Sequence, residues 1–156
     1  MHCRAAVLIA VFLLPHGTYA WAQGVAIRKT TPTAVTDRLK VELLPQGFGL
    51  ETANEKGALF TLDRGMVAQQ GSSLVRGGFV HVVLELQVWF NQKAEGLVVT
   101  ASETAVGDRN SPLGFRKPVQ SRVERDNLQR LLDMVRADLE AVAARDSTVK
   151  RDSSDQ

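Results

Sequence analysis

The hydrophobic pattern of the chain is most regular between Phe79 and Asn91. Every second residue of this stretch is apolar, while the residues between them include histidine, glutamate, glutamine and asparagine. A period of two over such a length is typical of a long β-strand with one buried face. We therefore expect the rest of the chain to cover that face. Its apolar positions are Val80, Val82, Leu84, Leu86, Val88 and Phe90.

Weaker alternation predicts three further strands. Two precede the central strand, from Phe48 to Ala53 and from Phe60 to about Gln69, with Gly65 marking a bulge or bend. Glycine ends the loop 55–57 between them, which suits a three-residue hairpin loop that places Leu50 opposite Leu62.

A second hairpin is predicted after the central strand, because the loop 93–96 also ends in glycine. This loop would place Leu86 opposite Glu103 on the apolar face. On the other face it would place Trp89 opposite Thr100 and Val83 opposite Val106.

Helical patterns flank the four strands. Thr31 and Pro32 form a start signal before Val35, Leu39 and Leu43, and Pro45 with Gly47 forms a stop, so we expect a helix from Pro32 to Leu44. A second, longer helix is predicted from a capping box at residues 121–124. Its apolar stripe would consist of Leu128, Leu131, Val135, Leu139 and Val142.

The order of these elements predicts a two-layer α+β sandwich. A four-stranded antiparallel meander would carry the short N-terminal helix and the long C-terminal helix on one face. This single domain would span residues 32–145. Residues 23–31 would be a flexible or edge-lying lead-in, residues 107–120 a long loop, and residues 146–156 a disordered polar tail.

The N-terminus has the pattern of a secretory signal peptide over residues 1–22. Arg4 precedes an apolar run at 5–14, and Ala20 and Ala22 provide the small residues of a cleavage site. The run is too short to span a bilayer, and no second hydrophobic run follows. The only cysteine, Cys3, leaves with the signal, so we expect a mature domain that is secreted or periplasmic, without disulfides, lipid anchor or transmembrane segment.

Charge gives no indication of a polyanionic partner. The chain has 19 basic and 17 acidic residues, and loss of Arg4 leaves the mature domain close to neutral. We therefore expect no general affinity for nucleic acid or for a membrane surface.

Residue usage excludes several kinds of catalytic site. His81 is the only histidine after the signal peptide, so a metal site with several His or Cys ligands is excluded, and any Ser-His-Asp arrangement would have to use it. We interpret His81 as an ordinary histidine at the start of the central strand. The sequence contains no phosphate-binding glycine loop and no nucleophile elbow, and it indicates no cofactor.

Glu103 is the most unusual position of the predicted fold, since the hairpin register turns it toward the core beside Leu86. Burial of a carboxylate costs free energy unless the group is paired or protonated. We expect a bulge near Ser102, or a register shifted by one residue, to turn Glu103 outward. The alternatives are a buried pair with an arginine and a functional acid in a pocket between sheet and helices.

The predicted loop 107–120 carries Arg109, Arg116 and Lys117, which could bind an anionic group or a partner, or could belong to a mobile connection. Its Leu113 and Phe115 are possible anchors on the sheet.

On the sheet face away from the helices, Phe79, Val83 and Trp89 form an apolar series. Such a surface is either an association site or is covered by the N-terminal segment or the long loop. Under the first interpretation, the domain would form a homodimer or bind an envelope protein.

The absence of most catalytic side chains favours a non-enzymatic exported domain that binds a protein partner or a small ligand in the cell envelope. Two alternatives remain open at this point. One is a hydrolase-like enzyme that uses carboxylates, which the residue content allows. The other is a carrier of an apolar ligand held between the sheet and the long helix.

Overall fold

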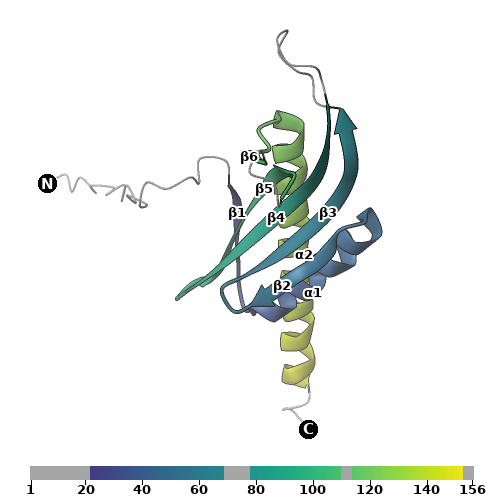
Figure 1. Cartoon of the computed structure of the whole chain (residues 1–156). Coiled ribbons are helices and arrows are strands. Elements are labelled where there is room, and N and C mark those ends of the chain that lie inside the picture. Colours follow the sequence, from purple (N-terminus) through teal and green to yellow (C-terminus); the bar gives the residue numbers. More distant parts are fainter. Residues whose placement is uncertain (1–21, 69–77, 110–113, 153–156) are drawn as a thin grey trace, which may run out of the picture.

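The computed structural model describes residues 22–68, 78–109 and 114–152. One antiparallel sheet packs against two helices, which confirms the expected α+β class (Figure 1). The sheet has six strands rather than four. All of the predicted signal peptide except Ala22 lies outside the described residues. In chain order the elements are β1 (Gln23–Ile27), α1 (Pro32–Leu43), η1 (Leu44–Gln46), β2 (Gly49–Asn54), β3 (Gly57–Ala68), β4 (Phe79–Lys93), β5 (Gly96–Gly107), β6 (Phe115–Pro118) and α2 (Arg122–Asp152).

The two strands that the sequence did not predict lie along one side of β5. The sheet order is β1-β5-β4-β3-β2, and β6 also pairs with β5. Val25 of β1 lies opposite Val99, and Arg116 of β6 lies opposite Val106, farther along β5. Of the two alternatives for the lead-in, flexible or edge-lying, residues 23–27 adopt the second as a paired edge strand, and part of the predicted loop 107–120 is a strand. Burial of Val25 and Ile27 in the core accounts for the docking of β1.

The register between β4 and β5 is the predicted one, with Leu86 opposite Glu103. The register between β2 and β3 is not, because Leu50 lies opposite Phe60 instead of Leu62. Asn54 lies opposite Gly57, so the loop holds two residues instead of the predicted three. The pairing shifts again between Leu50 and Thr52, where one extra residue is accommodated in β2. A bulge places two residues of one strand opposite one residue of its partner, so the register beyond the bulge cannot be read from the loop length.

The predicted irregularity at Gly65 is confirmed. The register of β3 against β4 shifts between Asp63 and Gly65, and Gly65 has a positive φ of 69°. Asp63 stabilises this bulge, since its Oδ1 accepts a hydrogen bond of 2.7 Å from the amide of Gly65. The bulge leaves Arg64 as the residue without a partner in the ladder between β3 and β4.

Helix α1 forms as its sequence predicts. Thr31 caps it by accepting a hydrogen bond from the amide of Ala34 at 3.2 Å, and Pro32 occupies the first turn. Its stripe of Val35, Leu39 and Leu43 is buried. The chain then makes the short turn η1 and leaves it at Gly47, whose φ of 90° suits glycine.

Helix α2 begins after Ser121, whose Oγ accepts a hydrogen bond from the amide of Glu124 at 3.3 Å. It runs to Asp152, so the polar segment predicted to be disordered from residue 146 is helical over much of its length. The buried face also differs in detail. Leu132 is buried, whereas Leu131 and Leu139 are only partly buried and Val142 is 53% exposed.

The two helices lie on the same face of the sheet (Figure 1) and meet through an ion pair. Arg38 of α1 contacts Asp138 of α2 with 2.5 Å between Nη2 and Oδ2. The hydrophobic core lies between the helices and the sheet. Its buried members include Ile27, Val35, Leu39, Phe60, Val88, Leu97, Val99, Leu132 and Val135.

Candidate functional site

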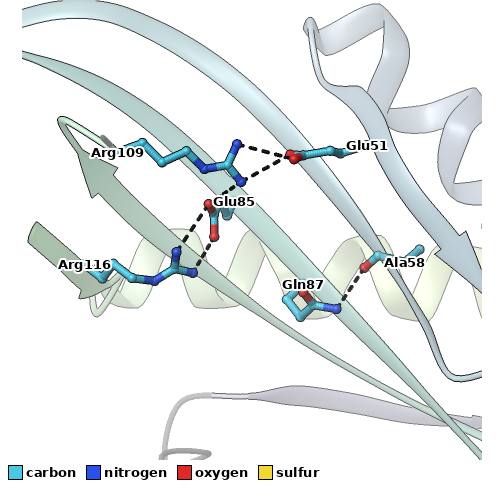
Figure 2. Close-up of polar contacts among 6 residues, drawn as sticks. All are labelled: Glu51, Ala58, Glu85, Gln87, Arg109 and Arg116. Atoms are coloured by element: carbon cyan, nitrogen blue, oxygen red, sulfur yellow. Dashed lines mark hydrogen bonds and ion pairs between the residues drawn. The ribbon is translucent and has the colours of Figure 1, made fainter. Parts of the chain in front are cut away.

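A buried carboxylate lies at the centre of the sheet face that the helices leave open. Glu85, on β4, is only 4% exposed, although it is flanked by Thr61 on β3 and Thr104 on β5 and no helix covers it. Two arginines bury it (Figure 2). Arg109 Nη2 lies 2.9 Å from Glu85 Oε1, and Arg116 Nη2 lies 2.5 Å from Oε2.

The cluster extends to the far edge of the sheet through Glu51. Both terminal nitrogens of Arg109 reach the Glu51 carboxylate, at 3.4 and 3.3 Å, as Figure 2 shows. The pKa of Arg109 is raised, chiefly by its hydrogen bond to Glu51 and also by Glu85. Arg109 therefore stays charged, and the four groups Glu51, Glu85, Arg109 and Arg116 balance in charge.

This charge cluster ties together parts of the chain that are distant in sequence. Glu51 comes from the bulge in β2, Glu85 from β4, Arg109 from the segment after β5 and Arg116 from β6. Separation of such a buried pair leaves an uncompensated charge, so the cluster favours the arrangement of strands in which all four groups meet. It offers no unpaired carboxylate or guanidinium for a ligand, so we assign it a structural role.

The apolar residues predicted on this face are spread along it. Val83 and Trp89 are partly buried, and Phe79 is 72% exposed at the outer end of β4. His81 is also on this face, and its Nε2 lies 2.9 Å from Asp63 Oδ1. The structure therefore gathers Arg109 and Arg116 around Glu85, but it does not bring Phe79 and Trp89 together.

Lys117 does not join the charge cluster. It alternates with Arg116 along β6 and lies over the ring of Phe115, with 5.4 Å from Nζ to the ring centre. Of the two expected anchors in this part of the chain, Phe115 is partly buried and Leu113 lies outside the described residues.

Glu103 is on the opposite face, toward the helices, which corrects the expectation that a bulge or shifted register turns it outward. The β4–β5 pairing is continuous through Ser102 and Glu103. Burial raises the pKa of the Glu103 carboxyl above its ordinary value, the negative charge of Glu124 raises it further, and Arg64 opposes both effects. Among the described residues, no hydrogen bond or ion pair reaches this carboxylate.

Glu103 lines a cavity of about 540 Å³ between the sheet and the helices. The cavity is lined by the end of α1 and by the first half of α2, N-terminal along α2 to Asp138, which contacts Arg38. Its sheet side consists of Leu62, Arg64, Leu84, Leu86 and Glu103. Its other walls are Glu42, Leu43, Gln46 and Phe48 from the α1 end and Glu124, Asn127, Leu128, Arg130, Leu131 and Met134 from α2.

The residues that sequence reasoning missed are Glu51 and Glu85. Glu85 was counted among the polar residues of the wet face, whereas it is buried by arginines that follow it by more than twenty positions. A carboxylate in the middle of a long strand, followed by two arginines in a predicted loop, was the available signal.

Comparison of the chain with models of known protein families and with curated proteins found no match. No helix in the described part of the chain is both long and apolar enough to cross a membrane. Over the same residues, no group of three or more His, Cys, Asp or Glu side chains is arranged to hold a metal ion. The function must therefore be argued from the geometry alone.

Proposed function

We propose that this domain binds a small ligand with an apolar body in the cavity between the sheet and the helices. The observation that supports the proposal is the size of this cavity, about 540 Å³, in a domain whose core is otherwise well buried. Protein interiors are close-packed, with few voids larger than a water molecule. Ligand pockets fall in a range of roughly 300–1,000 Å³.

The composition of the walls also supports a ligand site. Leu62, Leu84 and Leu131 are partly buried in the protein alone, so they retain apolar surface that a ligand can cover. Burial of such surface stabilises a complex by roughly 25 cal/mol per Å² before the cost of association is subtracted. Polar and ionic groups, Glu103 among them, stand beside this apolar surface, and in a small-molecule site such groups fix the orientation of the ligand.

The signal-peptide pattern assigns this binding to the periplasm or the cell exterior. A ligand-binding domain of the cell envelope fits the residue usage, because it requires no cysteine and no group of histidines, and His81 is the only histidine after the predicted signal peptide. The proposal thus combines two of the functions considered from the sequence, namely small-ligand binding and transport of an apolar molecule.

A probe ligand and a cavity-filling substitution test the proposal. Octan-1-ol titrated into the purified protein should shift the amide resonances of Leu84, Leu131 and their neighbours in ¹H–¹⁵N spectra. Leu84→Trp should fill the cavity and lower the affinity by about tenfold or more, since its bulk occupies the ligand volume. Leu44→Trp is the matched control, because Leu44 is 51% exposed and is not part of the cavity wall.

The two variants give opposite expected outcomes. Leu44→Trp should bind octan-1-ol as the wild type does. Shifts that spread over the surface without saturating, or equal binding by Leu84→Trp and the wild type, would show that the cavity is not a ligand site.

Glu103 also supports a second candidate, a hydrolase-like enzyme that uses carboxylates. A carboxyl group whose pKa is raised by burial and by a second carboxylate, Glu124, is suited to general acid catalysis. This candidate requires that a bound molecule is cleaved. Mass spectrometry of any molecule that copurifies with the protein, before and after prolonged incubation, distinguishes binding from turnover.

A further inference from the structure

The ionic groups around the cavity differ in burial and in whether they are paired. Its wall carries the acids Glu42, Glu103 and Glu124 and the bases Arg64 and Arg130. Two of these groups already have partners within the protein. Glu42 pairs with Arg38 at 2.6 Å, and Arg130 donates a hydrogen bond of 2.7 Å to Asn127.

The three remaining groups are Glu103, Glu124 and Arg64. Arg64 is an exposed residue in the bulge of β3, whereas Glu103 is partly buried on β5 with α2 above it. The effect of Glu124 on Glu103 is larger than that of Arg64, and the two effects have opposite sign. Among the ionic groups of the wall, Glu103 is the one that is partly buried and has no ion pair among the described residues.

The position of Glu103 relative to the apolar wall defines which end of an amphipathic ligand is polar and which is apolar. Glu103 lies opposite Leu86 on the neighbouring strand, and Leu84 is opposite Ala105, two residues farther along β5. An alkyl chain lying along Leu84 and Leu86 would thus place its head group beside the Glu103 carboxylate. Glu124, in the first turn of α2, lines the same cavity from the helix side.

We propose that the cavity selects an amphipathic cation, in which an ammonium head group lies between Glu103 and Glu124 and an alkyl body covers the leucines of the sheet. This inference rests on the proposed function, since it assigns the ligand class of the same cavity. An ammonium group donates up to three hydrogen bonds and carries a charge opposite to that of the two carboxylates. It would relieve the repulsion between Glu103 and Glu124 and replace the water lost from Glu103 on burial.

Three probes with the same alkyl chain test the head-group preference, namely octylamine, octan-1-ol and octanoate. Their affinities for the purified protein are measured by calorimetry at neutral pH, with ¹H–¹⁵N spectra to locate each probe. We expect octylamine to bind about tenfold or more tightly than octan-1-ol, which corresponds to one or two charge-assisted hydrogen bonds. Octanoate should bind most weakly, because its charge repels the two carboxylates.

Substitution of the carboxylate separates its role from that of the apolar wall. Glu103→Gln should lower the octylamine affinity to that of octan-1-ol and leave octan-1-ol binding unchanged. Glu95→Gln is the matched control, because Glu95 is exposed in the turn between β4 and β5, and this variant should keep the full preference.

Each result supports or overturns a specific part of the inference. Equal affinity for the three probes, or a preference for octanoate, would overturn the head-group assignment while leaving the ligand cavity intact. A preference for octylamine that survives in Glu103→Gln would overturn the role of Glu103. If none of the three probes binds, the proposed function itself fails, and the inference fails with it.

Discussion

Arg116 buries the carboxylate of Glu85 while it remains largely exposed itself. The side chain of Glu85 is 5% exposed and that of Arg116 is 62% exposed, with 2.5 Å between Nη2 and Oε2. Removal of Glu85 therefore leaves an exposed arginine, whereas removal of the arginines leaves the Glu85 carboxylate. An arginine without Glu85 can be solvated where it stands, whereas Glu85 between two glutamines in place of its arginines keeps part of its cover and loses both counterions.

This asymmetry predicts unequal costs for the two kinds of substitution. The double variant Arg109→Gln/Arg116→Gln should lower the free energy of unfolding by about 3–5 kcal/mol, because Glu85 loses both cations. Glu85→Gln should cost only about 1–3 kcal/mol, the range for lost hydrogen bonds to charged groups. Urea denaturation measures both values. Arg122→Gln, which removes an 89% exposed guanidinium, is the control and should be nearly neutral. A double variant milder than Glu85→Gln would mean that Glu85 is hydrated in solution.

Glu103 predicts a pH dependence of stability with a definite sign. Its pKa is higher in the folded protein than its ordinary value of 4.5, so the folded state binds the proton more tightly than the unfolded state. The stability that this proton contributes is fully present below pH 4.5 and is lost as the pH rises through the folded pKa.

Glu103→Gln removes this titration. The free energy of unfolding of this variant, relative to that of the wild type, should rise as the pH increases from 4.5 toward neutrality. Denaturation curves at several pH values give the difference, and Glu95→Gln should follow the wild type throughout. A constant difference between Glu103→Gln and the wild type would show that the carboxylate is solvated.

The same residue shows how far sequence reasoning reaches. The period of two and the loop 93–96 fixed the β4–β5 register correctly, including Leu86 opposite Glu103. The expectation that Glu103 turns outward was wrong because it assumed a packed layer above the sheet. In the structure a cavity lies there between the sheet and the helices, and the placement of α1 and α2 over the sheet depends on tertiary packing that no local pattern encodes.

The strands β1 and β6 were missed for a related reason. β1 alternates Val25 and Ile27 with glycine and alanine, so its pattern lacks polar contrast. β6 is four residues long and ends in Pro118. Short edge strands of this kind are stabilised by the neighbour that they pair with, in this case β5, and not by their own periodicity. Glu85 was missed because its partners come from β6 and from the segment after β5, both within the predicted loop 107–120.

Helix α2 offers a test of which face is buried. Leu132 is 1% exposed and belongs to the core, whereas Leu131, one residue earlier, is partly buried at the cavity wall. Leu132→Ala should lower the free energy of unfolding by about 2–5 kcal/mol. Leu131→Ala should cost less, because it enlarges an existing cavity instead of opening a new one. The reverse order in chemical denaturation would show that the helix is rotated about its axis.

The outer end of the β3–β4 hairpin is the place to test association. Phe79 is 72% exposed and Met66 is 63% exposed, and the register places Met66 opposite His81 on the same face. If this face joins two copies of the chain, as the sequence suggested, Phe79→Ser should shift a homodimer to monomer in sedimentation without changing the urea midpoint. Val41→Ser, at a 63% exposed position on α1, is the control. A wild-type chain that sediments as a monomer at high concentration contradicts the homodimer.

Gly107 allows β6 to dock against β5. Gly107 on β5 lies opposite Phe115, and the ring occupies the space where a side chain at position 107 would be. A Cβ there would lie 2.6 Å from the Cδ1 atom of Phe115, which is closer than real Cβ contacts. The residue after Phe115 is Arg116, so the position of the ring also fixes the arginine that covers Glu85.

Gly107→Ala should therefore displace the ring and β6 together and lower the free energy of unfolding by about 1–3 kcal/mol. Gly49→Ala is the matched control, since a Cβ at that strand position would meet nothing closer than the Thr61 carbonyl oxygen at 4.0 Å. A double-mutant cycle locates the effect. Phe115→Ala should cost less in the Gly107→Ala background than in the wild type, because the ring is already displaced there. Additive costs would show that the ring does not lie over Gly107, and the link from Gly107 to Arg116 and Glu85 would be lost.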